Sequence, residues 1–141
     1  MKALRSRKGL ITRRAWILLL SATLASGAGA AVQLVDDAGI TIRLEQPARR
    51  IISLAPSLTE LIFAAGAGDK LVGVVEYSDF PEAAAQLPRV GRHDSLDMER
   101  IVALQPDLIV AWQSGNPRAS INRLRELGFA VYTAEPRRLE D

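Results

Sequence analysis

Residues 51–60, IISLAPSLTE, decide the fold class. The apolar run at 51–54 stops before Pro56. Ser57 and Glu60 then have the S-x-x-E spacing of a capping box, in which each side chain satisfies a free backbone N–H at the start of a helix. A buried strand followed at once by a capped helix is the opening unit of an α/β fold. The turn between them lies at the carboxyl end of its strand, where open α/β sheets bind ligands.

The same unit recurs along the rest of the chain. Further strands are predicted at residues 71–75, 107–111 and 129–133, and helices at 58–65, 81–87, 96–104 and 117–127, with a loop at 89–95. Long apolar strands joined by short crossovers predict an α/β lobe with a parallel sheet of about four strands and helices on both faces. The loops at 55–57, 77–79, 112–114 and 135–136 should then gather along one edge of that sheet.

The two longer helices after residue 95 each show an apolar stripe that predicts their buried face. The predicted inward residues are Met98, Ile101, Val102, Leu104, Ile121, Leu124 and Leu127.

A β-hairpin is predicted ahead of this sheet. Residues 32–44, VQLVDDAGITIRL, are two β-rich runs that flank a turn-forming cluster ending at Gly39. Asp36 and Asp37 could instead form an acidic metal pocket, but a hairpin turn is the simpler explanation. Residues 31–46 are therefore assigned to a hairpin and connector, and residues 47–141 to the lobe itself.

Residues 1–30 read as a signal peptide. A basic start without acids leads into an apolar run at 15–25 and then into small residues that end at Ala30, the expected cleavage position. A transmembrane anchor is the alternative, but the uncharged run of 17 residues is short for a span of about 20. The sequence has no cysteine, which excludes disulfides and a lipid anchor on a cysteine. We therefore expect a monomeric periplasmic protein.

The basic balance of the chain belongs to this leader. Six of the 18 basic residues and none of the 16 acidic residues lie in it, so residues 31–141 carry 12 basic against 16 acidic residues, a formal charge of −4. A nucleic-acid partner, which needs a basic surface, is not expected.

The residues for common catalytic centres are missing from the sequence. It has one histidine, and no G-x-G-x-x-G follows the first strand. One histidine without spaced partners is not a metal site. A triad of Ser57, His93 and Asp94 is conceivable, but adjacent His and Asp rarely present that geometry. We expect no enzyme, no metal and no intrinsic cofactor, and a hydrolase that uses Ser57 stays as the enzymatic alternative.

Aromatic residues at the predicted edge suggest a ligand instead. Tyr77 and Trp112 follow strand ends, and His93 lies in a neighbouring loop. Flat apolar side chains with a polar tip suit a large, partly apolar ligand. Tyr77 and Trp112 could equally cap the sheet core, and His93 could be a solvated loop residue.

Segments that follow one another in order resemble the class III periplasmic substrate-binding proteins, of helical-backbone metal receptor type. They are IISLAPSLTELIFAAGAGDKLVGVVEYSDFP, LPRVG and LDMERIVALQPDLIVAWQSGNP. In pattern they are most similar to the cobalamin (vitamin B12)-binding proteins of ABC importers. The resemblance covers residues 47–141. It implies two α/β lobes joined by a long helix, ligand held between the lobes, and delivery to a membrane permease powered by an ATPase.

The resemblance also implies roles for individual residues. Pro56, Ser57 and Tyr77 match ligand contacts. His93 and Asp94 occupy the loop where a cobalamin-binding relative places a tryptophan and its neighbour. Glu99 matches a glutamate that docks an arginine of the permease. Trp112 is added because it is an aromatic residue at a strand end, so the predicted ligand residues are Pro56, Ser57, Tyr77, His93, Asp94 and Trp112.

Two departures from the family pattern keep alternatives open. His93 replaces an aromatic platform, which leaves room for haem, whose iron an imidazole can ligate, or for a ferric siderophore. The linking helix and second lobe are not in this sequence, so we expect an amino-terminal lobe only. From another class, a single-domain flavodoxin-like interaction module would fit the same length.

Overall fold

The computed structural model describes residues 30–136. The predicted signal peptide lies outside the described residues apart from Ala30, and so do residues 137–141, where the sequence suggests the start of another helix. Within the described part of the chain, no helix has both the length and the apolar character needed to cross a membrane.

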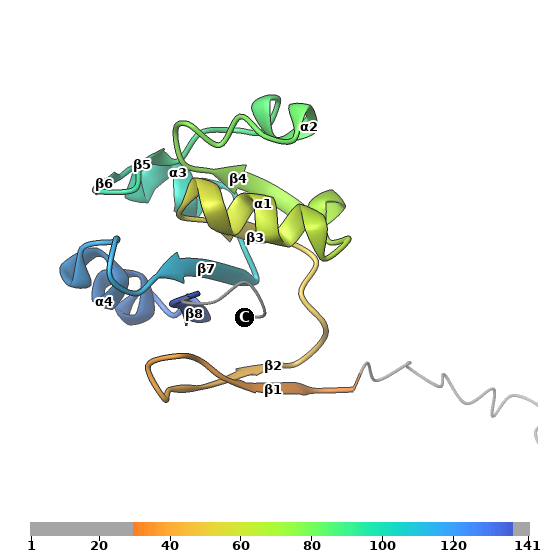
Figure 1. The fold of residues 1–141 in the computed structure, drawn as a ribbon. Helices are drawn as coiled ribbons and strands as arrows, with labels where there is room; N and C mark the ends of the chain where they lie inside the picture. The colour runs from red at the N-terminus through yellow and green to blue at the C-terminus, as the bar shows by residue number, and fades with distance from the viewer. Residues whose placement is uncertain (1–29, 137–141) are drawn as a thin grey trace, which may run out of the picture.

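A four-stranded parallel sheet forms the centre of the lobe, as the sequence predicts (Figure 1). Every neighbouring pair is parallel, and the strand order is β4-β3-β7-β8. The strands are β3 (Ile51–Ser53), β4 (Leu71–Val74), β7 (Leu108–Trp112) and β8 (Val131–Ala134). Because all four run the same way, their carboxyl ends meet at one edge.

Helices cover both faces of this sheet. The helical elements are α1 (Pro56–Ala64), the 3₁₀ turn η1 (Gly68–Lys70), α2 (Glu82–Ala85), α3 (Met98–Ala103) and α4 (Arg118–Glu126). Ile62 and Phe63 of α1 pack on one face, and α3 and α4 pack on the other. The backbone reversal that ends α1 falls at Gly66, whose φ of 76° is unfavourable for residues with a Cβ.

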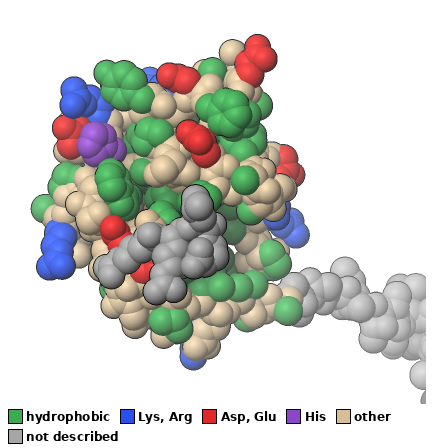
Figure 2. Space-filling model, in the orientation of Figure 1, with side chains coloured by type: hydrophobic (Ala, Val, Ile, Leu, Met, Phe, Trp, Pro, Cys, Tyr) green, Lys and Arg blue, Asp and Glu red, His purple; other side chains and the backbone are tan. Residues whose placement is uncertain are grey.

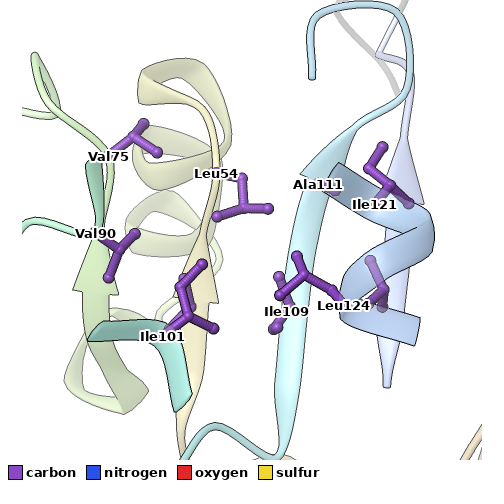
Figure 3. Close-up of a cluster of buried hydrophobic side chains, with 10 residues drawn as sticks. Leu54, Val75, Val90, Ile101, Ile109, Ala111, Ile121 and Leu124 are labelled. Carbon is purple, nitrogen blue, oxygen red and sulfur yellow. The ribbon is translucent and has the colours of Figure 1, made fainter. Parts of the chain in front are cut away.

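The larger hydrophobic cluster lies between the sheet, α3 and α4 (Figure 3). Ile109 and Ala111 of β7 point into it from the sheet, opposite Ile101 of α3 and Leu124 of α4, and all four are fully buried. The smaller cluster on the α1 face contains Leu108 and other residues that alternate with these along the strands. Alternation between two apolar faces explains the uninterrupted apolar runs in the sequence.

The predicted capping box is wrong. Helix α1 begins at Pro56, with Ala55 as its N-cap and no side-chain cap. Proline is well suited to the first helical position because its ring fixes φ and the missing N–H is not needed there. The helix therefore starts one residue before Ser57, which lies exposed in its first turn and cannot act as the cap.

Parts of the predicted apolar stripes are also wrong. Val102 of α3 is 46% exposed and Leu127, just after α4, is 43% exposed, whereas Ile101, Ile121 and Leu124 are buried as predicted. Helix α3 is only six residues long, so it presents a narrow buried face. The predicted loop at 89–95 forms most of a short antiparallel hairpin, β5 (Gly91–Arg92) with β6 (Ser95–Leu96), and the helix predicted from residue 96 begins at Met98.

The predicted amino-terminal hairpin is present as β1 (Val32–Val35) and β2 (Thr41–Leu44). Its turn is attached to β8 through Asp36, which is 4% exposed and accepts hydrogen bonds from the hydroxyl and the N–H of Thr133. The backbone N–H groups of Ala38 and Ile40 also donate to this carboxylate, and Arg125 lies 3.3 Å from it. Asp36 therefore serves the fold, not a metal.

The same contacts favour the ionised form of the Asp36 carboxyl. Burial raises the pKa of its carboxyl, but the hydrogen bonds from Thr133, Ile40 and Ala38 outweigh burial and hold the pKa below its ordinary value.

Candidate ligand-binding edge

The strand order places a topological switch point beside β3. After β3 the chain adds β4 on one side, and it then crosses to add β7 on the other side. The connections that leave β3 and β7 start toward opposite faces, since α1 packs on one face and α4 on the other. Open α/β sheets bind ligands in the crevice that this divergence creates at the carboxyl edge.

Trp112 and His93 come together at this edge. Trp112 is the last residue of β7, and its ring centroid lies 6.5 Å from that of His93, with the planes tilted by 44°. The position of the indole depends on Gly115, because a Cβ there would lie 1.8 Å from Trp112 Cε3. The structure thus brings two of the predicted ligand residues into one aromatic pair.

Asn116 joins three loops at the edge, and it is not among the residues predicted from the sequence. Its buried side-chain amide donates to the carbonyl of Leu54 (2.9 Å) and to that of His93 (2.8 Å). Its Oδ1 accepts the N–H of Trp112 (2.6 Å). One side chain therefore holds the end of β3, the β5–β6 turn and the end of β7 together. Its place in the turn-forming run S-G-N-P after a strand is the signal that could have pointed to it.

Pro56, Ser57 and Tyr77 occupy the two loops next to this junction. Pro56 is half-buried at the start of α1, and Ser57 is exposed beside it. Tyr77 lies in the turn after β4, which pairs with β3, and its side chain is 72% exposed. The carboxyl edge of β3 and its two neighbours thus carries five of the six predicted ligand residues.

Asp94, the sixth predicted residue, is engaged elsewhere. Its carboxylate accepts two hydrogen bonds of 3.1 Å from the guanidinium of Arg92, and this interaction lowers the pKa of Asp94. Both side chains are about half exposed. Figure 2 shows the histidine at the surface, close to both basic and acidic side chains. The Arg92–Asp94 pair therefore presents a polar rim beside His93.

Residues of a hydrolytic triad are not assembled within residues 30–136. No hydrogen bond joins Ser57 to His93, and Asp94 pairs with Arg92. No group of three or more His, Cys, Asp or Glu residues is placed to hold a metal ion in the same part of the chain.

A cavity of about 540 Å³ lies at the other end of the same edge. Leu61, Gln113, Tyr132 and Glu135 are among its lining residues, so it is separate from the predicted ligand residues. Burial and the nearby carboxylates of Asp37 and Asp36 raise the pKa of Tyr132. Glu135 accepts two hydrogen bonds of 2.9 Å from Ser114, which closes the loops after β7 and β8 onto each other.

Glu99 lies away from these loops, in the first turn of α3. Met98, Val102 and Ala103 surround it with a shallow apolar surface. A carboxylate in the first turn of a helix is favoured by the helix dipole, which explains its position without a partner.

The chain belongs to the periplasmic binding protein family, whose model, described as "periplasmic binding protein", matches residues 51–140. A vitamin B12-binding protein of Vibrio cholerae is 52% identical over 95 residues, which are 67% of this chain and 34% of that protein. The chain thus spans about a third of the length of the curated relatives it matches.

Comparison with solved structures shows the same family relationship. The crystal structure of the periplasmic vitamin B12-binding protein BtuF of Vibrio cholerae matches with a TM-score of 0.60 and 55% identity, covering 62% of this chain and 34% of that one. A periplasmic haem-binding protein of Pseudomonas aeruginosa matches with a TM-score of 0.58 and 36% identity, covering 61% and 31%. Both relatives are binding proteins by name.

Proposed function

We propose that this chain belongs to the cobalamin-binding component of an ABC importer. The observation that carries the proposal is the junction of Trp112, His93 and the β3 turn at the switch point, in a chain 52% identical over 95 residues to a vitamin B12-binding protein. A corrinoid is a large disc with apolar faces and an amide-bearing rim. The rings of Trp112 and Tyr77 offer flat apolar contacts, and the Arg92–Asp94 pair offers polar ones.

In this proposal the lobe forms one wall of a cleft whose other wall comes from a second lobe. Pro56, Ser57, Tyr77, His93 and Trp112 would face the ligand directly, with Asp94 at the rim. Affinity for such a ligand depends on desolvating both of its faces, so one wall alone should bind weakly.

Titration of the purified chain with cyanocobalamin, followed by calorimetry, tests both parts. We expect heats that show binding weaker than about 10 μM, a Kd that corresponds to roughly −7 kcal/mol. Tight, stoichiometric binding by this chain would contradict the one-wall arrangement. Heats no larger for cyanocobalamin than for a dye of similar size would contradict the corrinoid assignment.

Haem or a ferric siderophore is the second candidate ligand. His93 favours haem, because an imidazole at the edge can ligate iron and a haem-binding protein is among the similar structures. Haemin absorbance in the presence of the chain distinguishes the two. Iron ligation by His93 would shift the Soret band, and His93→Ala would abolish the shift. A corrinoid site should leave the haemin spectrum the same in both variants.

The proposal further includes export by the leader to the periplasm, action as a monomer, and docking on a membrane permease powered by an ATPase. Glu99 and its apolar surroundings on α3 are the proposed permease contact, on the strength of the family pattern. We propose a binding protein, not an enzyme. Esterase activity that is present in the wild type and lost in Ser57→Ala would contradict this.

A further inference from the structure

The turn after β4 holds Tyr77 in an unusual conformation. Tyr77 has a φ of 67°, in the left-handed region that residues with a Cβ rarely adopt. The side chain gains no burial in exchange, since it is 72% exposed and belongs to neither hydrophobic cluster. The backbone conformation must therefore be imposed by the contacts of the flanking residues.

Arg89 makes the contacts on both sides of Tyr77. Its Nη1 donates to the carbonyl of Val75 (3.3 Å) and to that of Ser78 (3.0 Å), so one guanidinium spans the turn. Its Nη2 donates to Asp79 Oδ1 at 2.9 Å. The backbone of Arg89 is fixed in turn by a parallel bridge to Val74 of β4, and its side chain is only 26% exposed.

A buried hydroxyl cluster holds the same turn from the side of α1. The hydroxyl of Thr59 lies 2.9 Å from Ser53 Oγ and 3.3 Å from Ser78 Oγ, and all three residues are essentially buried. The N–H of Glu76 donates to the carbonyl of Gly91 at 2.8 Å. The turn is therefore anchored to β3, to α1 and to the β5–β6 hairpin, while the tyrosine ring itself stays exposed.

We propose that Arg89 is a positioning residue for ligand binding. Its planar fork keeps the turn at residues 75–79 in the conformation that presents Tyr77 to the ligand before the ligand arrives. The gain in affinity comes from preorganisation, because the entropic cost of ordering the turn is met during folding and does not reduce the free energy of binding. Lysine would keep the charge but lose the planar fork, in which Nη1 holds the two carbonyls while Nη2 holds Asp79. The inference rests on the proposed function for its effect on affinity.

The first test needs no ligand. A residue with positive φ shows a strong NOE between its own amide proton and Hα, because the two protons are close in that conformation. We expect this NOE of residue 77 to fall several-fold in Arg89→Gln and to stay unchanged in Arg123→Gln, a control on the exposed face of α4. An unchanged NOE in Arg89→Gln would overturn the proposal.

The second test asks whether the effect on affinity passes through Tyr77. We expect Arg89→Gln to weaken cyanocobalamin binding about tenfold when residue 77 is tyrosine, and by less than about twofold in a Tyr77→Ala background. Equal losses in the two backgrounds would overturn the proposal, since Arg89 would then act elsewhere.

Two further outcomes are separable. If the wild type binds no cobalamin, the proposed function fails, and the NOE still decides whether Arg89 positions Tyr77. If Arg89→Gln unfolds, both measurements are made on Arg89→Lys, which retains the buried stem and the charge. A lysine variant with the wild-type NOE and affinity would contradict the requirement for the fork.

Discussion

At the scale of single residues, the carboxyl edge is organised by a buried side chain, Asn116, and not by the exposed residues of the proposed site. Asn116 uses both amide hydrogens and its oxygen on backbone groups of three separate loops. Trp112 and His93 meet because their backbones are held by this one amide. The residues that touch the ligand in our proposal are therefore placed by a residue that does not.

Replacing Asn116 should destabilise the lobe and separate the aromatic pair. Asn116→Asp keeps the acceptor for Trp112 but sets an oxygen against the carbonyls of Leu54 and His93, at a cost of about 3 kcal/mol. Urea unfolding measures the loss of free energy, and the fluorescence of Trp112 reports its altered surroundings. Asn122→Asp, on the exposed face of α4, is the matched control and should change stability by less than about 0.5 kcal/mol. Equal stability of the two variants would show that Asn116 does not hold the loops.

At the scale of secondary-structure elements, the hairpin β1–β2 is attached to the sheet through Asp36 and Asp37, and the carboxylate of Asp36 is buried. The carboxylate of Asp36 accepts hydrogen bonds from five donor groups. One is the guanidinium of Arg125 in α4, and two are the N–H and the hydroxyl of Thr133 in β8. This arrangement ties the beginning of the described chain to its end.

The attachment should depend on pH in a defined direction. Because the pKa of Asp36 is lowered by folding, its contribution to stability is complete above the unfolded pKa of about 3.9 and is lost as the pH falls through the folded value. At pH 7, Asp36→Asn should cost about 2 to 3 kcal/mol. The difference from wild type should shrink below about pH 4, as urea unfolding at several pH values can measure.

Asp69→Asn, at an exposed residue of η1, serves as the control for this series. A deficit of Asp36→Asn that stays constant from pH 7 to about pH 3 would show that the Asp36 contacts do not depend on its charge.

The sequence predicts the elements better than it predicts their arrangement. The apolar runs and the helix-ending Gly66 locate all four parallel strands and α1 to within a few residues. The order β4-β3-β7-β8 was not predicted, because a crossover of the same length can place the next strand on either side of β3. The hairpin at 91–96 was missed because its two-residue strands are too short to show an alternating pattern.

For the candidate site too, local features can be predicted from the sequence, whereas contacts between distant segments cannot. The position of Trp112 at a strand end follows from local sequence, so the edge could be predicted. The role of Asn116 depends on a carbonyl group that is distant along the chain. The role of Arg89 depends on carbonyl groups presented by a turn conformation that the sequence does not reveal. Hydrogen bonds of this kind become visible only when the loops are seen together.

At the scale of the whole molecule, the described chain is a layered structure centred on β7. This strand pairs with both β3 and β8, and its side chains enter both hydrophobic clusters. A defect in β7 should therefore be felt throughout the lobe.

Ile109→Ala tests this cooperativity. The side chain is fully buried between the sheet and the helices, so we expect a loss of about 3 to 4 kcal/mol. Far-ultraviolet circular dichroism and Trp112 fluorescence should report one coincident urea transition, shifted to lower urea. Val102→Ala, at a side chain that is 46% exposed, should stay within about 0.5 kcal/mol of wild type. Two separate transitions would contradict a single folding unit.

The turn of the first hairpin also determines how this lobe can meet other chains. The outer side of β8 carries backbone groups that do not pair with β7, and Asp36 and Asp37 occupy those of Thr133 and the N–H of Glu135. An unpaired border of this kind is a template for strand addition and aggregation. Here that border is blocked by a turn of the same chain, so growth of the sheet past β8 is prevented at Thr133. On this side of the sheet a partner is left to approach through the faces or the carboxyl edge, which is where we propose that the ligand binds.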